Sequence, residues 1–299
     1  MSLTYQHFTY DMEVSSRLDR WLKRKYNGCT QGAIEKAIRA RFVRVNGEKT
    51  SAGTALTIGT SVSVEIHLHQ KWEEMSHDVL CPTVAYSFDS LILDETADFL
   101  ILNKPSGLDV QGGSHVHENI DDWLRTKSSE YRLVHRIDRA TSGLLIVAKS
   151  LSSAISITQM FRIRNVKKCY RAIVVGELAS KAGEINLPIA NHPKIASMMA
   201  VGTNDGKDAS TNYRLKNFNP QENWSDVELF PLTGRKHQLR LHMSAIGHPI
   251  IGDDKYGGHL HLADMPKNVL LLHAWRISLP AVGLRWEAPL PTYWPNCAC

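Results

Sequence analysis

Short apolar runs with strand-like composition follow one another at irregular intervals from residue 91 to the end of the chain. Helix-like stretches interrupt them only near residues 120–125, 151–162 and 236–246. A doubly wound parallel sheet would need a helix after nearly every strand, so the pattern favours an α+β fold with a mixed, mainly antiparallel sheet. The strands that we predict span residues 91–93, 99–103, 144–149, 170–175, 227–230 and 284–287.

The positive charge of the chain is concentrated near its start. Residues 15–66 hold ten Lys and Arg residues and four acidic residues, whereas the whole chain of 299 residues has a net charge of +5. Apolar residues recur at helical spacing around Trp21 and Ile34, and strand-like runs follow at residues 42–47 and 62–66. We therefore predict a small α+β domain with a polyanionic partner. A basic helix face that is merely solvated would show the same charge pattern.

A stretch without clean periodicity separates this domain from the rest. We interpret residues 67–90 as a linker and residues 91–299 as the larger domain. His67 and His69 precede no second pair of Cys or His residues at metal-ligand spacing, so we expect no zinc site. The five cysteines are odd in number and scattered, which indicates a reducing compartment; Cys297 and Cys299 leave a minor hypothesis of metal binding or redox cycling.

Several classes of protein are disfavoured by what the sequence lacks. No run approaches the roughly 18 apolar residues of a membrane span, and the first sixteen residues contain neither Lys nor Arg nor an apolar signal segment. There is no glycine-rich dinucleotide fingerprint and no phosphate-binding loop. We expect a cytoplasmic monomer that does not bind a membrane and uses no nucleotide cofactor.

The segment from His135 to Lys149 carries a polar cluster into an apolar strand. Asp138 lies between Arg136 and Arg139 at the entrance to that strand. A carboxylate between two arginines at the end of a buried strand is suited to act as an ionised nucleophile or base, and Gly143 would permit a tight turn into the strand. An aspartate that only caps the turn would produce the same local sequence. Both interpretations remain open at this point.

Two later segments contain residues that could complete a site. Tyr170 stands near the start of an apolar strand, where a tyrosine is ordinarily part of the core. Further along, His237 and Arg240 lie three residues apart on one face of a predicted helix, and Leu239 lies on the opposite, core-facing side. An arginine on an otherwise buried helix needs an acidic partner.

The order of these motifs resembles a known family. The patterns R-L-D-x-x-L and V-x-V-N-G within residues 17–47 resemble an S4 domain, a small RNA-binding module. The sequences H-R-I-D-R-A-T-S-G-L-L at 135–145, K-C-Y-R-A-I-V-V-G at 168–176 and G-R-K-H-Q-L-R-L-H at 234–242 resemble the motifs of the RluA-type RNA pseudouridine synthases. The loop at 105–113 is most similar to RluC-type members, which act on large-subunit (23S-type) ribosomal RNA.

The resemblance implies a pseudouridine synthase fold behind an S4-like RNA-binding domain, and isomerisation of uridine in RNA without a cofactor or metal. It implies that Asp138 is the nucleophile, that Arg240 is its ion-pair partner, and that Tyr170 stacks on the target uracil. Arg136 would fill the space left by the flipped base, and Leu241 is expected to contact the substrate.

Two other functions are compatible with parts of the sequence. A catalytically silent RNA-binding or ribosome-assembly factor would share the basic domain, but it would have little need for Asp138, Tyr170 and Arg240 together. A glycoside or nucleoside hydrolase would also use a carboxylate, although such enzymes normally require a second acid that faces the first.

Overall fold

The computed structural model describes residues 4–12, 15–26, 29, 31–77, 87–112, 119–195, 198–202, 205–258, 260–262 and 265–295. The chain forms two compact units, one from Met1–Tyr86 with Gln111–Asn119 and one from Ser87–Val110 with Ile120–Cys299. We call them the N-terminal unit and the C-terminal unit. The hypothesis about Cys297 and Cys299 falls outside the described residues.

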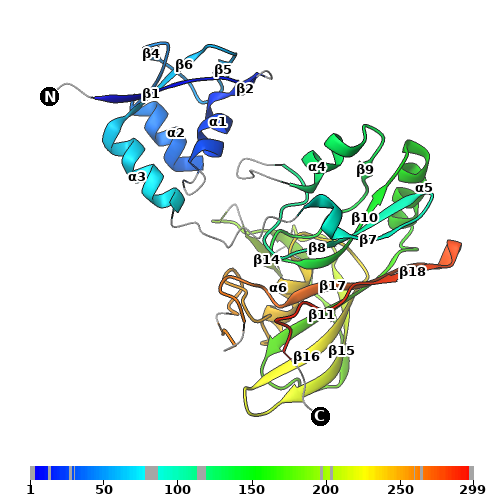
Figure 1. Cartoon of the computed structure of the whole chain (residues 1–299). Coiled ribbons are helices and arrows are strands. Elements are labelled where there is room, and N and C mark those ends of the chain that lie inside the picture. The colour runs from blue at the N-terminus through cyan, green and yellow to red at the C-terminus, as the bar shows by residue number, and fades with distance from the viewer. Residues whose placement is uncertain are drawn as a thin grey trace. The chain divides into compact units, whose positions relative to one another are not determined.

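A small antiparallel sheet with three helices makes up the N-terminal unit (Figure 1). The predicted succession of two helices, a strand, a turn and a strand is confirmed, and the strand order of the sheet is β1-β6-β3-β4. Apolar side chains of α1, α2 and β6 meet in one core. The elements are β1 (Tyr5–Thr9), β2 (Ser16–Arg17), α1 (Leu18–Lys25), α2 (Gln31–Arg39), β3 (Val43–Val45), β4 (Glu48–Lys49), β5 (Ala55–Leu56), β6 (Ser61–Glu65) and α3 (Ile66–His77).

The linker prediction for residues 67–90 is wrong where α3 forms. Trp72 is 3% exposed and Leu68 packs against the same core, so this helix belongs to the N-terminal unit. The Glu65 carboxylate accepts hydrogen bonds from the backbone N–H groups of His67 and Leu68, which caps the helix start. Only a few apolar residues face the core, and the many charged and histidine side chains between them obscured the helical period.

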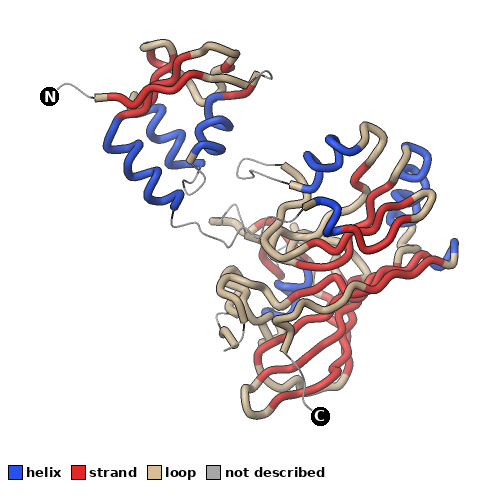
Figure 2. The backbone as a smooth tube through the Cα atoms, viewed as in Figure 1, coloured by secondary structure: helices blue, strands red, loops and turns tan. Residues whose placement is uncertain are grey.

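The C-terminal unit is built around a sheet of ten strands (Figure 2). Its main path runs β12-β15-β16-β11-β17-β10-β8-β7, with β18 paired to β17 and β9 paired to β10. Within this sheet all strand pairs are antiparallel except β10 and β17, which confirms the predicted mixed, mainly antiparallel α+β architecture. The elements are β7 (Ile92–Glu95), β8 (Phe99–Lys104), α4 (Ile120–Lys127), β9 (Arg132–Leu133), β10 (Ser142–Ala148), α5 (Leu151–Arg162), β11 (Lys167–Val175), β12 (Ala182–Asn186), β13 (Ile189–Asn191), β14 (Met199–Val201), β15 (Ser210–Asn219), β16 (Trp224–Pro231), α6 (Gln238–Ala245), β17 (Leu272–Leu279) and β18 (Leu284–Glu287).

Sequence reasoning missed two long strands of this sheet, β15 and β17. Along β15 most side chains are only partly buried, and polar residues occupy much of the strand. The central strand β17 includes His273, which is 1% exposed and whose Nδ1 lies 2.8 Å from the Ser142 hydroxyl on the neighbouring strand β10. A buried histidine of this kind breaks the apolar run that a local pattern needs.

Tyr170 marks the place where two apolar clusters on one face of the sheet meet. Helix α4 packs on a cluster that includes Leu145 and Val147 of β10. Helix α6 packs through Leu239 and Met243 on a second cluster from β11, β16 and β17. Because Tyr170 contacts both clusters, the two lie side by side and the tyrosine stands at their boundary.

Gly143 allows β10 and β17 to lie against each other. We expected this glycine to make a turn, but it lies within β10, opposite Ala274, with a φ of +104°. A Cβ atom there would lie 2.4 Å from the carbonyl oxygen of Ala274. The residue is therefore required for the close approach of two backbones as well as for its positive φ.

We expect Gly143→Ala to lower the free energy of unfolding by roughly 2–5 kcal/mol, because overpacking adds to the backbone strain. Gly257 also has a positive φ, of +95°, but a Cβ atom at this residue would meet nothing within 4 Å. Gly257→Ala is therefore the control for backbone strain alone. Equal losses for the two variants in urea unfolding would show that the close approach to Ala274 is unimportant.

Candidate active site

The backbone of Asp138, and not its side chain, closes the turn before β10. The Asp138 carbonyl oxygen accepts a hydrogen bond from the backbone N–H of Thr141 at 3.0 Å. The half-buried carboxylate has no hydrogen-bond partner among the described residues and lines a cavity. The interpretation of Asp138 as a side-chain cap is therefore wrong, and its carboxylate is available to a ligand.

Lys104 supports the backbone turn that carries Asp138. This fully buried side chain donates from Nζ to the carbonyl oxygens of Pro105, Leu108 and Arg139, at 2.9, 2.7 and 3.0 Å. The backbone N–H of Gly107 also donates to the Arg139 carbonyl, at 2.9 Å. Burial lowers the pKa of Lys104 to about 7, against the opposing attraction of Asp109 and Asp138. The loop after β8 thus supports the Asp138 turn and is not among the described residues that line the cavity.

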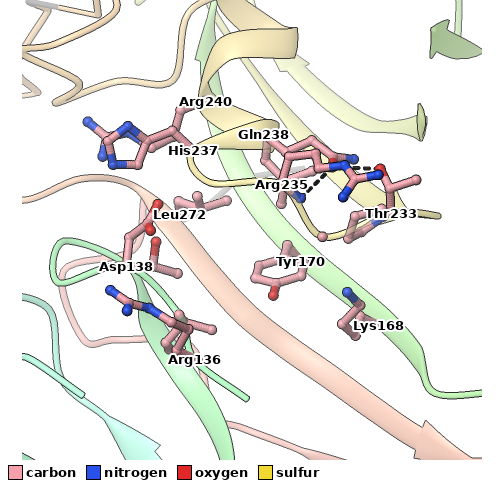
Figure 3. A pocket seen from close by; sticks show the side chains of 15 residues that line it. Arg136, Asp138, Lys168, Tyr170, Thr233, Arg235, His237, Gln238, Arg240 and Leu272 are labelled. Atoms are coloured by element: carbon pink, nitrogen blue, oxygen red, sulfur yellow. Dashed lines mark hydrogen bonds between the residues drawn. The ribbon is translucent and has the colours of Figure 1, made fainter. Parts of the chain in front are cut away.

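Tyr170 lies in the middle of the cavity, between Asp138 and Lys168 (Figure 3). Burial raises the pKa of its hydroxyl, and the nearby Asp138 raises it further. Lys168 stands two residues earlier on β11, and burial lowers the pKa of its amine. The tyrosine is therefore a neutral phenol at neutral pH, with an aromatic face available to a planar ligand.

Arg240 forms its ion pair with Asp253, which corrects the expected pairing with Asp138. The Arg240 Nε and Nη2 atoms donate to the two carboxylate oxygens of Asp253 at 2.8 and 2.6 Å, and both side chains are buried. Burial disfavours the charged guanidinium, but Asp253 and then Asp138 raise the pKa of Arg240 above its ordinary value. Asp138 thus interacts with Arg240 only at longer range, and the two oxygens of Asp253 accept the bidentate hydrogen bonds of the guanidinium.

The two predicted substrate-contacting residues lie in different surroundings. Arg136 is exposed and lines the cavity. Leu241 is 7% exposed and packs in a core cluster with Ile189, Ala209 and Tyr256. The structure therefore brings Arg136, Asp138, Tyr170 and Arg240 to one cavity, whereas Leu241 is not among the described residues that line it.

The cavity is small, about 110 Å³. Pockets that enclose drug-sized ligands begin at roughly 300 Å³, so this one suits a single ring-sized group of a larger ligand. Gln238 shapes its rim: its side-chain oxygen accepts from the hydroxyl of Thr233 at 2.6 Å and from the backbone N–H of Arg235 at 3.0 Å (Figure 3). These bonds tie the loop after β16 to the start of α6.

Three residues that shape the site were not singled out from the sequence, namely Lys104, Lys168 and Asp253, and His237 was placed on the helix face beside Arg240 without a specific role. Asp253 could have been predicted because a buried arginine needs an acidic partner. Asp138 satisfied that requirement equally well in the sequence, so only geometry could distinguish the two. No local pattern marks Lys104, because its acceptors are backbone carbonyls brought together by the fold.

Three histidines, two of them buried and the third, His135, half-buried, make the C-terminal unit sensitive to acid. Burial is the largest cause that lowers the pKa of His135 to about 3 and those of His237 and His273 to about 4. The unfolded chain binds a proton at each site below about pH 6.5, so it holds more protons than the folded state between pH 6.5 and 4. Stability must therefore rise with pH through this window.

We expect the free energy of unfolding to fall by up to about 2 kcal/mol per histidine between pH 7 and pH 5. Urea unfolding at several pH values measures the effect. His135→Gln, which keeps an acceptor for the backbone N–H of Ile146, should make the dependence shallower. A stability that is constant over this range would contradict the assignment of neutral buried imidazoles.

The fold and the site define a class of protein in which a mainly antiparallel sheet positions an aspartate, a tyrosine and an arginine around a cavity of ring size. Residues 98–245 match the family described as RNA pseudouridylate synthase, and residues 16–62 match the S4 domain. Among the described residues, no helix is long and apolar enough to cross a membrane, and no group of three His, Cys, Asp or Glu residues is arranged to hold a metal ion.

Curated and structural relatives agree with this class. The chain is 35% identical to ribosomal large subunit pseudouridine synthase C of Rickettsia bellii, over 95% of this chain and 98% of that protein. It is also 35% identical to the protein of the same name from Vibrio vulnificus, over 88% and 84% of the two chains. The structure of human RNA pseudouridylate synthase domain containing 1 superposes with a TM-score of 0.57 and 29% identity, over 66% of this chain and 82% of that one. The chain belongs to the RNA pseudouridylate synthase family.

Proposed function

We propose that this enzyme converts one or more uridines of large-subunit ribosomal RNA to pseudouridine in the cytoplasm, acting as a monomer with Asp138 as the essential carboxylate. The relatives named above support the choice of RNA, since both are named for the large ribosomal subunit. The observation that carries the catalytic assignment is the Asp138 carboxylate, which faces the cavity beside Tyr170 without a hydrogen-bond partner among the described residues.

The reaction breaks the N1–C1′ bond of uridine and joins C1′ to C5, while C5 loses a proton and N1 gains one. An ionised Asp138 would either attack the nucleotide or remove a proton from it. The ion pair with Asp253 holds Arg240 in the wall of the cavity that Asp138 also lines, so that the guanidinium can stabilise the carboxylate at longer range. Arg240 is in this scheme a residue that stabilises and positions, while Asp138 does the chemistry.

The environment of Tyr170 favours a role in stacking on the uracil over a role in removing the C5 proton. A phenol that takes the C5 proton must first be a phenolate, and the raised pKa of Tyr170 makes that form scarce at neutral pH. Its ring, at the boundary of two apolar clusters, offers a flat face for the uracil. We therefore propose that Tyr170 holds the base in the plane that the rotation requires.

The size of the cavity implies that the target nucleotide leaves its helix. A ring-sized space admits one base but not a duplex, and flipping a base costs a few kcal/mol. We propose that the exposed side chain of Arg136 occupies the vacated position. Leu241, which packs in the core, would act by shaping the cavity from behind and not by direct contact.

The composition of the cavity argues against a hydrolase. Asp138 is the only acid among the described residues that line it, whereas glycoside hydrolases pair two carboxylates. Pseudouridine mapping of ribosomal RNA from cells with and without this chain tests the proposal. Loss of a large-subunit pseudouridine in its absence, restored by the wild type and not by Asp138→Asn, is expected; release of free uracil would indicate the hydrolase.

The N-terminal unit should supply RNA affinity that depends on salt. Its exposed basic side chains include Arg20, Lys36 and Arg41. Changing all three to Gln should weaken RNA binding and reduce the slope of log K against log salt by about 0.7–0.9 for each phosphate that is no longer neutralised. The exposed Arg285 of β18 provides a control with one charge removed from the other unit. An unchanged slope in the triple variant would refute this role.

A further inference from the structure

His237 occupies a backbone conformation that its residue type rarely adopts. It precedes α6 in the left-handed region, with φ 54° and ψ 19°. This conformation costs a residue other than glycine roughly 1–2 kcal/mol. The imidazole is 8% exposed and lines the cavity with Asp138 and Arg240, and Figure 3 shows the three side chains on the same side of it. The strained backbone directs the ring toward the proposed reaction centre.

Hydrogen bonds to Tyr256 select one tautomer of this histidine. The Tyr256 hydroxyl lies 2.7 Å from His237 Nδ1 and accepts a hydrogen bond from the backbone N–H of Met199 at 3.0 Å. The hydroxyl already accepts one hydrogen bond, and its own proton forms a hydrogen bond here only if it is donated to Nδ1. Nδ1 must then be unprotonated. The proton of a neutral imidazole consequently resides on Nε2.

The surroundings keep the imidazole neutral. Burial is the main cause that lowers the pKa of His237 to about 4; Arg240, Lys255 and Lys236 lower it further, and Asp138 opposes them. No described residue hydrogen-bonds to Nε2. The ring therefore presents a single uncharged N–H group that is available in a cavity containing one acid and several cations.

We propose that His237 is a further substrate-contacting residue, whose Nε2–H donates a hydrogen bond to a carbonyl oxygen of the flipped uracil. When the N1–C1′ bond breaks, its electron pair stays with the uracil, and negative charge spreads onto the ring carbonyl oxygens. A fixed donor at one of these oxygens stabilises that charge without transferring a proton. This inference rests on the proposed function of Asp138 and concerns the fate of the base once Asp138 has acted.

Two substitutions of His237 distinguish the loss of the Nε2–H donor from a disturbance of the folded structure. Asn tolerates the left-handed conformation, and its short amide can replace Nδ1 as the acceptor for Tyr256 but cannot reach the position of Nε2. The amide of Gln is one carbon longer and reaches that position. We expect His237→Asn to lower the single-turnover rate at saturating RNA by about 10²–10³-fold, with RNA affinity changed by less than about threefold. His237→Gln should stay within about tenfold of the wild type.

The measurements are single-turnover pseudouridine formation, RNA binding and urea unfolding, together with the ¹⁵N spectrum of His237 in the wild-type protein. A wild-type rate for His237→Asn overturns the proposal, as does an equal loss for Asn and Gln in folded variants. A proton on Nδ1 in the ¹⁵N spectrum also overturns it, even if both variants fail to fold. Absence of pseudouridine formation by the wild type would instead refute the proposed function.

Discussion

Asp138→Asn should lower the rate of pseudouridine formation by at least about 10⁴-fold while leaving RNA affinity nearly unchanged. The amide is almost the same size as the carboxylate, but it can neither attack carbon nor accept a proton. The Asp138 turn should persist, since it is closed by the backbone bond to Thr141 and supported by Lys104. Tritium release from RNA labelled at C5 of uridine measures turnover, and filter binding measures affinity.

Asp89→Asn is a matched control for this result. Asp89 is 70% exposed, pairs with Lys127 and is not among the residues that line the cavity, so its loss should leave turnover at the wild-type level. Retained turnover in Asp138→Asn would exclude this carboxylate as the reacting group. Loss of turnover together with loss of cooperative unfolding would instead show that Asp138 is required for the fold.

Arg240→Met should be among the most destabilising single substitutions in the C-terminal unit. It leaves the Asp253 carboxylate, which is 0% exposed, without its cation. Removing one partner of a buried ion pair costs about 3–5 kcal/mol. Urea unfolding measures this loss, and Arg125→Gln provides a comparison, because Arg125 is 72% exposed in its pair with Asp121 and surface pairs contribute only about 0–1 kcal/mol.

The double variant Arg240→Met, Asp253→Leu separates stability from catalysis. With both charges removed, part of the lost stability should return, because no uncompensated charge stays buried, although the backbone N–H groups of Lys255 and Tyr256 lose the Asp253 acceptor. Turnover should remain low, since Asp138 still lacks the nearby guanidinium. Full activity in the double variant would show that Arg240 serves only the fold, and a single variant as stable as the wild type would contradict the ion pair itself.

The sequence predicted the members of the site better than their pairings. The resemblance of three motifs to the family indicated Asp138, Tyr170 and Arg240, and the structure places all three on one cavity. It did not distinguish Asp138 from Asp253 as the partner of Arg240, since both acids satisfy the same chemical requirement. The roles of these residues in turnover stay predictions until the variants above are measured.

For the fold, too, the sequence predicted some features and missed others. Apolar periodicity located α1, α2, α5 and half of the described strands of the C-terminal unit, because burial of one face is a local property of the chain. It failed for α3, where charged and histidine side chains separate the few apolar residues that face the core, such as Trp72. It also failed for β17, where the buried His273 interrupts the apolar run.

The sequence by itself determined the α+β class, the basic character of the first domain and the chemical groups around Asp138, since these follow from composition, periodicity and motif order. Only the tertiary structure decided that Lys104 supports the Asp138 turn, that Arg240 pairs with Asp253, and that the Tyr256 hydroxyl lies within hydrogen-bond distance of His237 Nδ1. Each of these interactions joins residues between 13 and 35 positions apart. Their geometry depends on the order and register of strands across the whole sheet, which no local pattern encodes.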